Sequence, residues 1–375
     1  MKVYLDNAAT TALDPEVISI MSQSMAQDYG NPSSSHSFGR SSRSVIETSR
    51  RTIANLLNAD TSEIFFTSSG TEADNMAIRG AVRDAGVKHI VTSKIEHPAV
   101  LNTVAHLLRK NKVTVDYVDI NELGEIDVVH LAHILSNNSN VLVSLMHGNN
   151  EIGNLLDLEK VSQICQEHNA LFHSDTVQTI GHYHFDLKKI KIDFLTCSAH
   201  KFHGPKGVGF LYINKDVNIT PLIHGGSQER NMRGGTECVY GITGLAKAME
   251  VAYRDLRDHQ KHIEQLKEHM IEEIKDRLPF ASFNGCSSDL KKSMYTVLSV
   301  SFPMEEYSNL LLFNLDLLGV SCSGGSACSS GAVSQSHVIS EISTQNGPVV
   351  RFSFGKFNTF KDVDFAIQQL CSLFN

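Results

Sequence analysis

An uninterrupted apolar stretch of membrane-spanning length is absent from this sequence. Residues Met1–Thr10 include an acidic side chain and lack the apolar core of a secretion signal. These two absences predict a cytoplasmic protein that does not act on a membrane. The chain has 375 residues, of which 41% are hydrophobic and 20% charged, so it can bury a large core.

An excess of positive charge is also absent. The 33 Lys and Arg residues are outnumbered by 41 Asp and Glu, and the net charge of −8 argues against direct binding of nucleic acid. The seven cysteines are an odd number in a long chain, which does not indicate a disulfide framework. The 18 histidines are dispersed and lack the spacing of metal ligands, so we predict no metal site.

Short apolar stretches alternate with amphipathic ones over much of the chain, which predicts an α/β protein with a mainly parallel sheet covered on both faces. Asp14 and Pro15 are expected to cap and begin the first helix. Further helices are expected at Ser41–Leu57, Ala73–Val82, Ala99–Lys110, Val128–Ser136, Leu158–His168, Gly241–Arg254, Leu256–Leu278, Ser308–Leu318 and Phe360–Phe374. Strands are expected at Ile64–Thr67, His89–Ser93, Val113–Val118, Val141–Met146, Ala170–His173, Asp193–Cys197, Val208–Ile213, Met294–Phe302 and Val349–Phe354.

Polar side chains follow four of these strands. His97 follows the strand at His89–Ser93, and Asn150 follows Val141–Met146. Asp175 and Gln178 come after Ala170–His173, and Lys201 comes after Asp193–Cys197. Because ligands bind at the carboxyl ends of parallel strands, we expect these residues to meet around one ligand.

Three segments rich in glycine and small polar residues are candidates for binding or chemistry. Ser68–Glu72 joins a strand to a helix, which is typical of phosphate binding, although an ordinary serine-capped helix start is an alternative. Arg230–Thr236 is a basic, glycine-rich loop suited to anions. Ser321–Gly331 contains Cys322 and Cys328, which suggests a reactive thiolate; a metal site shared with His337 or a redox disulfide are alternatives.

The chain resembles cysteine desulfurases of the class V aminotransferase family, which use pyridoxal 5′-phosphate (PLP). The resemblance extends over nearly the whole length and rests on many motifs in order. They are YLDNAATT, GNPSSSHSFGR, FTSSGTEADN, EHPAV, MHGNNEIG, HSDTVQ, SAHKFHGPKG, MRGGTE, SGGSACSSG and RFSFG. It implies the fold of type I PLP-dependent transferases, in which a large domain with a mainly parallel seven-stranded sheet carries a small α+β C-terminal domain.

The resemblance also implies a role for each matching residue. Lys201 would carry PLP as a Schiff base, Asp175 would pair with the ring nitrogen, and His97 would stack on the ring and move protons. Asn150 and Gln178 would bind near the phenolic oxygen of the ring. Arg351 would take the substrate carboxylate, with Asn31 also near the substrate. The phosphate would be bound by Gly70, Thr71, Ser198, His200 and, from the second subunit of a homodimer, Thr236.

Cys328 would then be the nucleophile that removes sulfur from L-cysteine, which leaves alanine and an enzyme persulfide. The persulfide would be passed to an acceptor protein, for iron–sulfur cluster assembly or for tRNA thiolation. The usual serine pair of the loop is replaced here, so that Cys322 adds a thiol near Cys328. The chain also ends soon after Arg351, whereas relatives serving a general iron–sulfur scaffold often have a longer tail, and the acceptor therefore stays open.

We expect an N-terminal segment, residues 1–14, that packs with the small domain, a large PLP-binding domain at 15–255, and a small domain at 256–375 that carries the catalytic cysteine. Two other interpretations remain. Another class V PLP enzyme, a selenocysteine lyase or an aminotransferase, would explain Lys201 and Asp175 but would leave Cys328 without a purpose. A non-catalytic scaffold protein would leave the whole set of site residues without a purpose.

Overall fold

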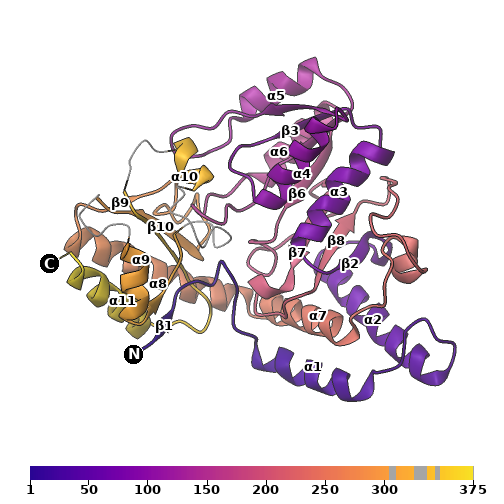
Figure 1. The fold of residues 1–375 in the computed structure, drawn as a ribbon, viewed down its shortest axis with the longest axis horizontal. Coiled ribbons are helices and arrows are strands. Elements are labelled where there is room, and N and C mark those ends of the chain that lie inside the picture. Colours follow the sequence, from indigo (N-terminus) through magenta and orange to yellow (C-terminus); the bar gives the residue numbers. More distant parts are fainter. Residues whose placement is uncertain (304–309, 325–335, 343–346, 375) are drawn as a thin grey trace.

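We describe the fold from a computed structural model, which covers residues 1–303, 310–324, 336–342 and 347–374. The central feature is a seven-stranded sheet with the order β2-β8-β7-β6-β5-β3-β4 (Figure 1). All neighbouring pairs are parallel except those of β8, which runs against both β2 and β7. The predicted α/β class is confirmed. The strands are β2 (Ile64–Thr67), β3 (His89–Thr92), β4 (Thr114–Tyr117), β5 (Val141–Ser144), β6 (Leu171–Asp175), β7 (Phe194–Ser198) and β8 (Gly209–Ile213).

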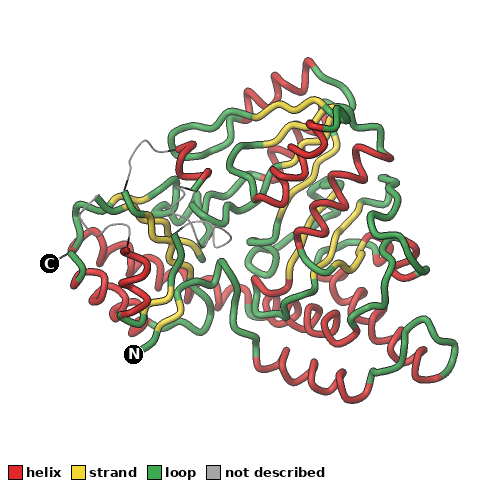
Figure 2. Tube along the Cα trace, in the orientation of Figure 1, coloured by secondary structure: helices red, strands yellow, loops and turns green. Residues whose placement is uncertain are grey.

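Helices cover both faces of this sheet, as the layers in Figure 2 show. Alternate side chains of β5 divide between the two faces: Leu142 packs in a cluster with α3 and α4, whereas Val141 and Val143 pack in a cluster with the helices opposite. One face is covered by α3 (Gly70–Asp84) and α4 (Pro98–Arg109). The other is covered by α2 (Ser37–Leu56), α5 (Val128–Asn137), α6 (Leu158–Glu167) and α7 (Val239–Arg254), and α1 (Pro15–Gln27) packs against α7.

The C-terminal part has its own sheet and its own core. Its sheet has the order β12-β10-β9, all antiparallel, and its core also takes in Val3 and Leu5 from the N-terminus. The strand β1 (Val3–Tyr4) pairs with β11 (Val320–Ser321). The separate cores accord with the expected domain boundaries, which stay a prediction. The remaining elements are α8 (Leu256–Arg277), β9 (Ser282–Phe283), β10 (Val297–Ser301), α9 (Leu311–Leu317), α10 (His337–Ile342), β12 (Val349–Ser353) and α11 (Phe360–Ser372).

Helix starts differ most from the sequence prediction. Asp14 caps α1 as expected, since its carboxylate accepts a hydrogen bond from the N–H of Glu16 at 2.7 Å. The helix expected from Ser41 begins at Ser37, because the His36 ring accepts a hydrogen bond from the N–H of Gly39. The helix expected from Ala73 begins at Gly70, because Ser69 caps it. Histidine is an uncommon cap, and a glycine near a helix start is easily assigned to the preceding turn.

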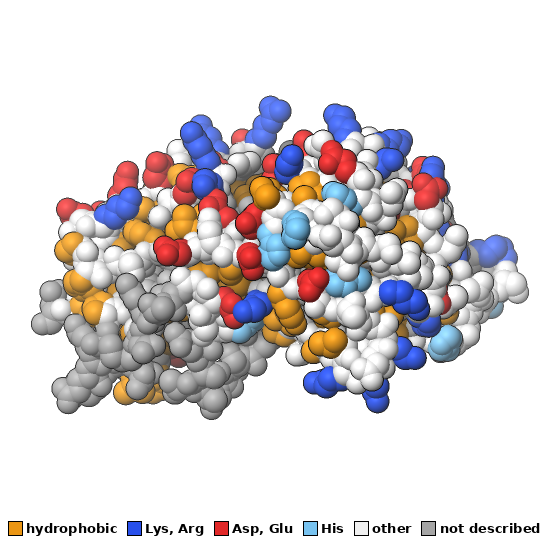
Figure 3. Space-filling model, turned by 90° about the horizontal axis from the view of Figure 1, so that it is seen from above, with side chains coloured by type: hydrophobic (Ala, Val, Ile, Leu, Met, Phe, Trp, Pro, Cys, Tyr) orange, Lys and Arg blue, Asp and Glu red, His pale blue; other side chains and the backbone are white. Residues whose placement is uncertain are grey.

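No helix within the described ranges is long and apolar enough to cross a bilayer. On the face drawn in Figure 3, Lys and Arg side chains are interspersed with Asp and Glu rather than gathered into one basic area.

Candidate active site

A cavity of about 250 Å³ opens at the carboxyl ends of the central strands, next to the C-terminal part of the chain. It brings together residues that are far apart in the sequence. Most residues singled out from the sequence lie in its lining, which consists of Ala8, Ala9, Gly70, Thr71, Asp74, His97, Met146, Asn150, Asp175, Val177, Gln178, His200, Lys201 and Arg351. The expectation that polar groups after four strands would meet is therefore confirmed.

Lys201 lies in the short 3₁₀ turn Ala199–Lys201, directly after β7. Its Nζ donates to the backbone oxygens of Ala8 and Ala9, at 2.6 and 2.9 Å. Gln178 Nε2 also donates to Ala8 O, at 3.0 Å. The N-terminal segment thus holds both side chains at the cavity.

Asp175 ends β6 and is buried. One carboxylate oxygen accepts a hydrogen bond from the N–H of Val177 at 2.9 Å. Burial, and next the neighbouring carboxyl of Asp74, raise the pKa of Asp175 to about 6, while His97 opposes this rise. A carboxylate in such surroundings is stabilised by a nearby cation, such as a protonated ring nitrogen.

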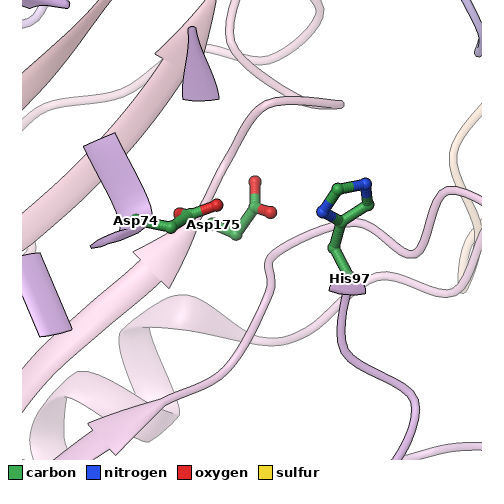
Figure 4. Close-up of side chains that lie close together, drawn as sticks. All are labelled: Asp74, His97 and Asp175. Carbon is green, nitrogen blue, oxygen red and sulfur yellow. The ribbon is translucent and has the colours of Figure 1, made fainter. Parts of the chain in front are cut away.

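His97 caps α4, and its Nδ1 accepts a hydrogen bond from the N–H of Ala99 at 3.1 Å. In the neutral ring this leaves the proton on Nε2. Burial lowers the pKa of His97, with Asp175 opposing and Lys201 adding to the effect. His97 and Asp175 each have a side-chain ligand atom within 4.8 Å of the other and of Asp74 (Figure 4).

The turn from β2 into α3 provides a place for an anion. Gly70 is the first residue of the helix, so its N–H and that of Thr71 have no partner within the helix. A Cβ at Gly70 would lie 2.5 Å from Val177 Cγ2 and 3.7 Å from Ser198 Cβ, so only glycine fits this contact. His200 lies beside the turn, and burial, followed by Lys201, lowers its pKa to about 4, so its ring is neutral at pH 7.

Arg351 projects from β12 into the same cavity and is 1% exposed. Its guanidinium donates to the backbone oxygen of Asn150 at 2.7 Å and to Asp6 Oδ1 at 2.9 Å. Its Nε is buried and has no hydrogen-bond partner among the described residues. A carboxylate entering the cavity would meet a guanidinium already fixed in position.

Cys328 lies outside the described residues, but the described residues on either side of 325–335 are bound to residues in the cavity lining or next to it in the sequence. Before it, Ser323 exchanges backbone hydrogen bonds with Arg351, at 2.6 and 3.3 Å. After it, Ser336 bonds the Glu151 carboxylate and His337 Nε2 lies 3.0 Å from Glu96 O.

Three residues predicted from the resemblance do not line the cavity. Ser198 is buried at the end of β7, beneath the Gly70 turn. Thr236 is exposed and lines a second cavity of about 200 Å³ together with Ser68 and Arg233. Asn31 lies exposed in the loop between α1 and α2, where its side chain accepts from the N–H of Ser33. Their roles stay predictions.

The sequence interpretation missed other residues at the site. Asp74, in the FTSSGTEADN motif, was given no role, although a helical spacing of four from Gly70 places it on the same face of α3. The backbone oxygens of Ala8 and Ala9, and the Asp6 carboxylate that pairs with Arg351, had no local signal. All three of these contacts join the N-terminus to residues more than 190 positions away.

Comparison with known proteins shows the family to which this fold belongs. The family described as aminotransferase class-V matches residues 3–365. A protein of Dictyoglomus turgidum named cysteine desulfurase IscS is 42% identical over 98% of this chain and 93% of its own length. One of Bacillus subtilis named putative cysteine desulfurase IscS 1 is 39% identical over 99% of this chain and 98% of its own length. The chain belongs to the class V aminotransferase family.

Solved structures give the same result. A NifS-like protein superposes with a TM-score of 0.91 at 36% identity, covering 100% of this chain and 99% of that one. A structure described as SspA in complex with cysteine superposes with a TM-score of 0.80 at 29% identity, over 95% of this chain and all of that one. The predicted recognition of the family is confirmed, and enzymes of this family use PLP in general.

Proposed function

We propose that this chain is a PLP-dependent cysteine desulfurase, which removes sulfur from L-cysteine and gives L-alanine. The observation that carries the proposal is the lysine amine at the carboxyl ends of the strands, in one cavity with Asp175, His97 and Arg351. Relatives of nearly the same length at about 40% identity, which are named cysteine desulfurases, support it.

The residues present fit PLP. Gly70 and Thr71 line the cavity, so a phosphate there would lie at the first N–H groups of α3, where the helix dipole favours an anion. Lys201 would bind the cofactor aldehyde through its amine, and the Asp175 carboxylate would keep the ring nitrogen protonated. When bound, PLP withdraws electrons from the α-carbon of an amino acid.

The side chains around the ring would divide the remaining tasks. Arg351 would bind the substrate carboxylate through its fixed guanidinium, and Asn150 and Gln178 would orient the ring from the side of its phenolic oxygen. Neutral His97 would exchange the proton on its Nε2 during the reaction.

Cys328 would take the sulfur. Its thiolate attacks the substrate sulfur, the carbon–sulfur bond breaks, and the electron pair of that bond stays with the carbon that becomes the alanine methyl group. Cys328 then carries a persulfide. A sulfur-acceptor protein would receive that sulfur, and the acceptor is either an iron–sulfur scaffold or a carrier for tRNA thiolation.

Turnover of L-cysteine tests this function. The purified protein with PLP is expected to release alanine and, with a thiol reductant, sulfide in equal amounts. Intact-mass and peptide analysis after L-cysteine alone should find an added sulfur on Cys328. Transamination of L-cysteine without sulfide, or turnover of L-selenocysteine alone, would instead favour another class V enzyme.

The homodimer belongs to the same proposal. Thr236 is exposed and does not line the cavity of its own chain, which supports a role at the phosphate of a second subunit. Analytical ultracentrifugation should give twice the chain mass. Mixed dimers of Thr236→Ala and Lys201→Ala should have one subunit site lacking both residues and one lacking neither, so mixing should restore part of the activity.

A further inference from the structure

Asp74 is a buried carboxyl group to which the function proposed above assigns no task. It lies on α3, is 1% exposed and lines the cavity. Its carboxylate, that of Asp175 and the His97 ring each have a ligand atom within 4.8 Å of the others. In Figure 4, Asp175 lies between Asp74 and His97. Asp74 is thus the neighbour of Asp175 on the side away from His97.

The surroundings of Asp74 supply little compensation for a negative charge. Its Oδ1 lies 3.3 Å from His173 Nε2, yet neither atom has a hydrogen-bond partner among the described residues. His173 is fully buried on β6, and burial lowers its pKa to about 4, so its ring is neutral at pH 7. The ionisable groups on the neighbouring elements include His173 and Asp175 on β6, Glu96 and His97 between β3 and α4, Cys197 on β7 and Lys201 in the turn after β7. Tyr212 on β8 and His106 and Arg109 on α4 complete the ionisable groups on the helices and strands that pack against α3.

Three of these neighbouring groups bear on the charge of Asp74. Asp175 and Glu96 are acids, and the Lys201 amine donates to the backbone oxygens of Ala8 and Ala9. Burial raises the pKa of Asp74 to about 7, with the influence of the Thr196 hydroxyl opposing the rise. Two buried carboxylates at this separation repel each other, and one of them is expected to keep its proton.

We propose that Asp74 is a positioning residue that keeps a proton beside Asp175, so that the pair directs a single negative charge at the ring nitrogen of the cofactor. This inference rests on the proposed function. One carboxylate balances one protonated ring nitrogen, whereas a second ionised aspartate would leave an uncompensated buried charge.

His173 fits a neutral Asp74. Residues 173 and 175 are two apart on β6, so both side chains are on the sheet face that α3 covers. The His173 Nδ1 is 2.8 Å from Ser144 Oγ, and this hydroxyl can either donate to or accept from the ring. His173 can therefore offer Asp74 a lone pair for its proton without taking a charge itself.

Infrared spectroscopy of the protein without PLP tests the proton directly. Protein labelled with ¹³C in the aspartate carboxyl groups is expected to show the C=O stretch of protonated aspartate at about pH 6, well above the ordinary range of this side chain. Asp74→Asn should remove part of that band and leave a smaller remainder. Asp193→Asn is the matched control: burial also raises the pKa of Asp193 to about 6, but this residue precedes β7, away from the cavity lining.

Binding of PLP, followed by visible absorption, tests the consequence for the cofactor. Asp74→Asn replaces a neutral acid with a neutral amide and should keep the PLP dissociation constant within about threefold of the unchanged protein at pH 7. Asp175→Asn removes the partner of the ring nitrogen and should weaken binding by about 30-fold or more. Asp193→Asn should leave binding unchanged.

Two results would overturn the inference: an infrared band unaffected by Asp74→Asn, or PLP binding weakened as much by Asp74→Asn as by Asp175→Asn. Should the asparagine variant not fold, Asp74→Ser and the pH titration of the band in the unchanged protein provide the same decision. A protein that binds no PLP at all would contradict the proposed function, whereas the infrared result would still report the protonation of Asp74.

Discussion

The floor of the cavity and its wall from the C-terminal part are built in different ways. The floor consists of strand ends: Asp175 ends β6, Lys201 follows β7, and His97 caps the helix after β3. The wall is formed by Arg351 on β12, whose backbone exchanges hydrogen bonds with Ser323. The floor would bind the cofactor, and the wall would bind and cleave the substrate. Variants that affect one region and spare the other can therefore test this division.

Lys201→Ala should have the largest effect, because it removes the amine that would bind the cofactor and take part in the reaction. Activity on L-cysteine should fall by about 10³-fold or more, and the visible absorption of lysine-bound PLP should vanish. Lys206→Ala, an exposed lysine in the same loop, is the matched control and should retain both. Normal absorption and turnover in Lys201→Ala would show that the Lys201 amine does not bind the cofactor.

Cys328→Ser should come next and should separate the two regions. Sulfide release should fall by about 10²-fold or more, because the serine hydroxyl cannot take the sulfur, while PLP absorption stays unchanged. Cys322→Ser and Cys238→Ser are the controls, and both should remain active. Unchanged L-cysteine turnover in Cys328→Ser would show that a different group takes the sulfur.

Arg351→Gln should act on substrate binding. Loss of the charged hydrogen bonds to the substrate carboxylate should raise KM for L-cysteine by about 10- to 100-fold, with the affinity for PLP retained. Asp6→Asn removes the ionic partner of Arg351 but leaves the guanidinium, so a smaller rise in KM is expected. If Arg351→Gln weakened PLP binding and left KM unchanged, the guanidinium would belong to the floor instead.

Asp175→Asn should stabilise the protein without PLP, although it weakens cofactor binding. Burial raises the pKa of Asp175 from 3.8 to about 6, so the folded state holds this proton more tightly than the unfolded state does. The carboxyl contributes stability below about pH 4, and this contribution is lost as the pH rises through about 6.

Above about pH 6, Asp175→Asn should therefore be more stable than the unchanged protein by about 1–3 kcal/mol. At about pH 4 the two should be nearly equal, because the aspartate is then protonated. Thermal unfolding without PLP at several pH values measures the difference. Equal stability of the two proteins across the whole pH range would mean that burying the Asp175 carboxylate does not destabilise the folded protein.

The residues of the floor could be predicted from the sequence. The contacts that hold Arg351 in the wall, such as its pairing with Asp6, could not. Each floor residue lies at the end of its own strand or just after it, and parallel strands bring their carboxyl ends to one edge, so local patterns suffice. Helix starts were less predictable: the α2 cap is His36, a residue seldom used for capping, and α3 already begins at Gly70. Of the expected helix Ser308–Leu318 the structure describes residues 310–318, and within them the helix α9 is Leu311–Leu317.

The sequence by itself determined the alternation of strands and helices and the chemistry after each strand, because periodicity and turn residues act over a few positions. Only the tertiary structure decided that Ala8 and Ala9 hold the Lys201 amine, that Asp6 pairs with Arg351 from 345 positions away, and that Asp74 lies next to Asp175. Those contacts depend on how α3 and the N-terminus pack against the carboxyl ends of the central strands, and no local pattern in the chain encodes that packing.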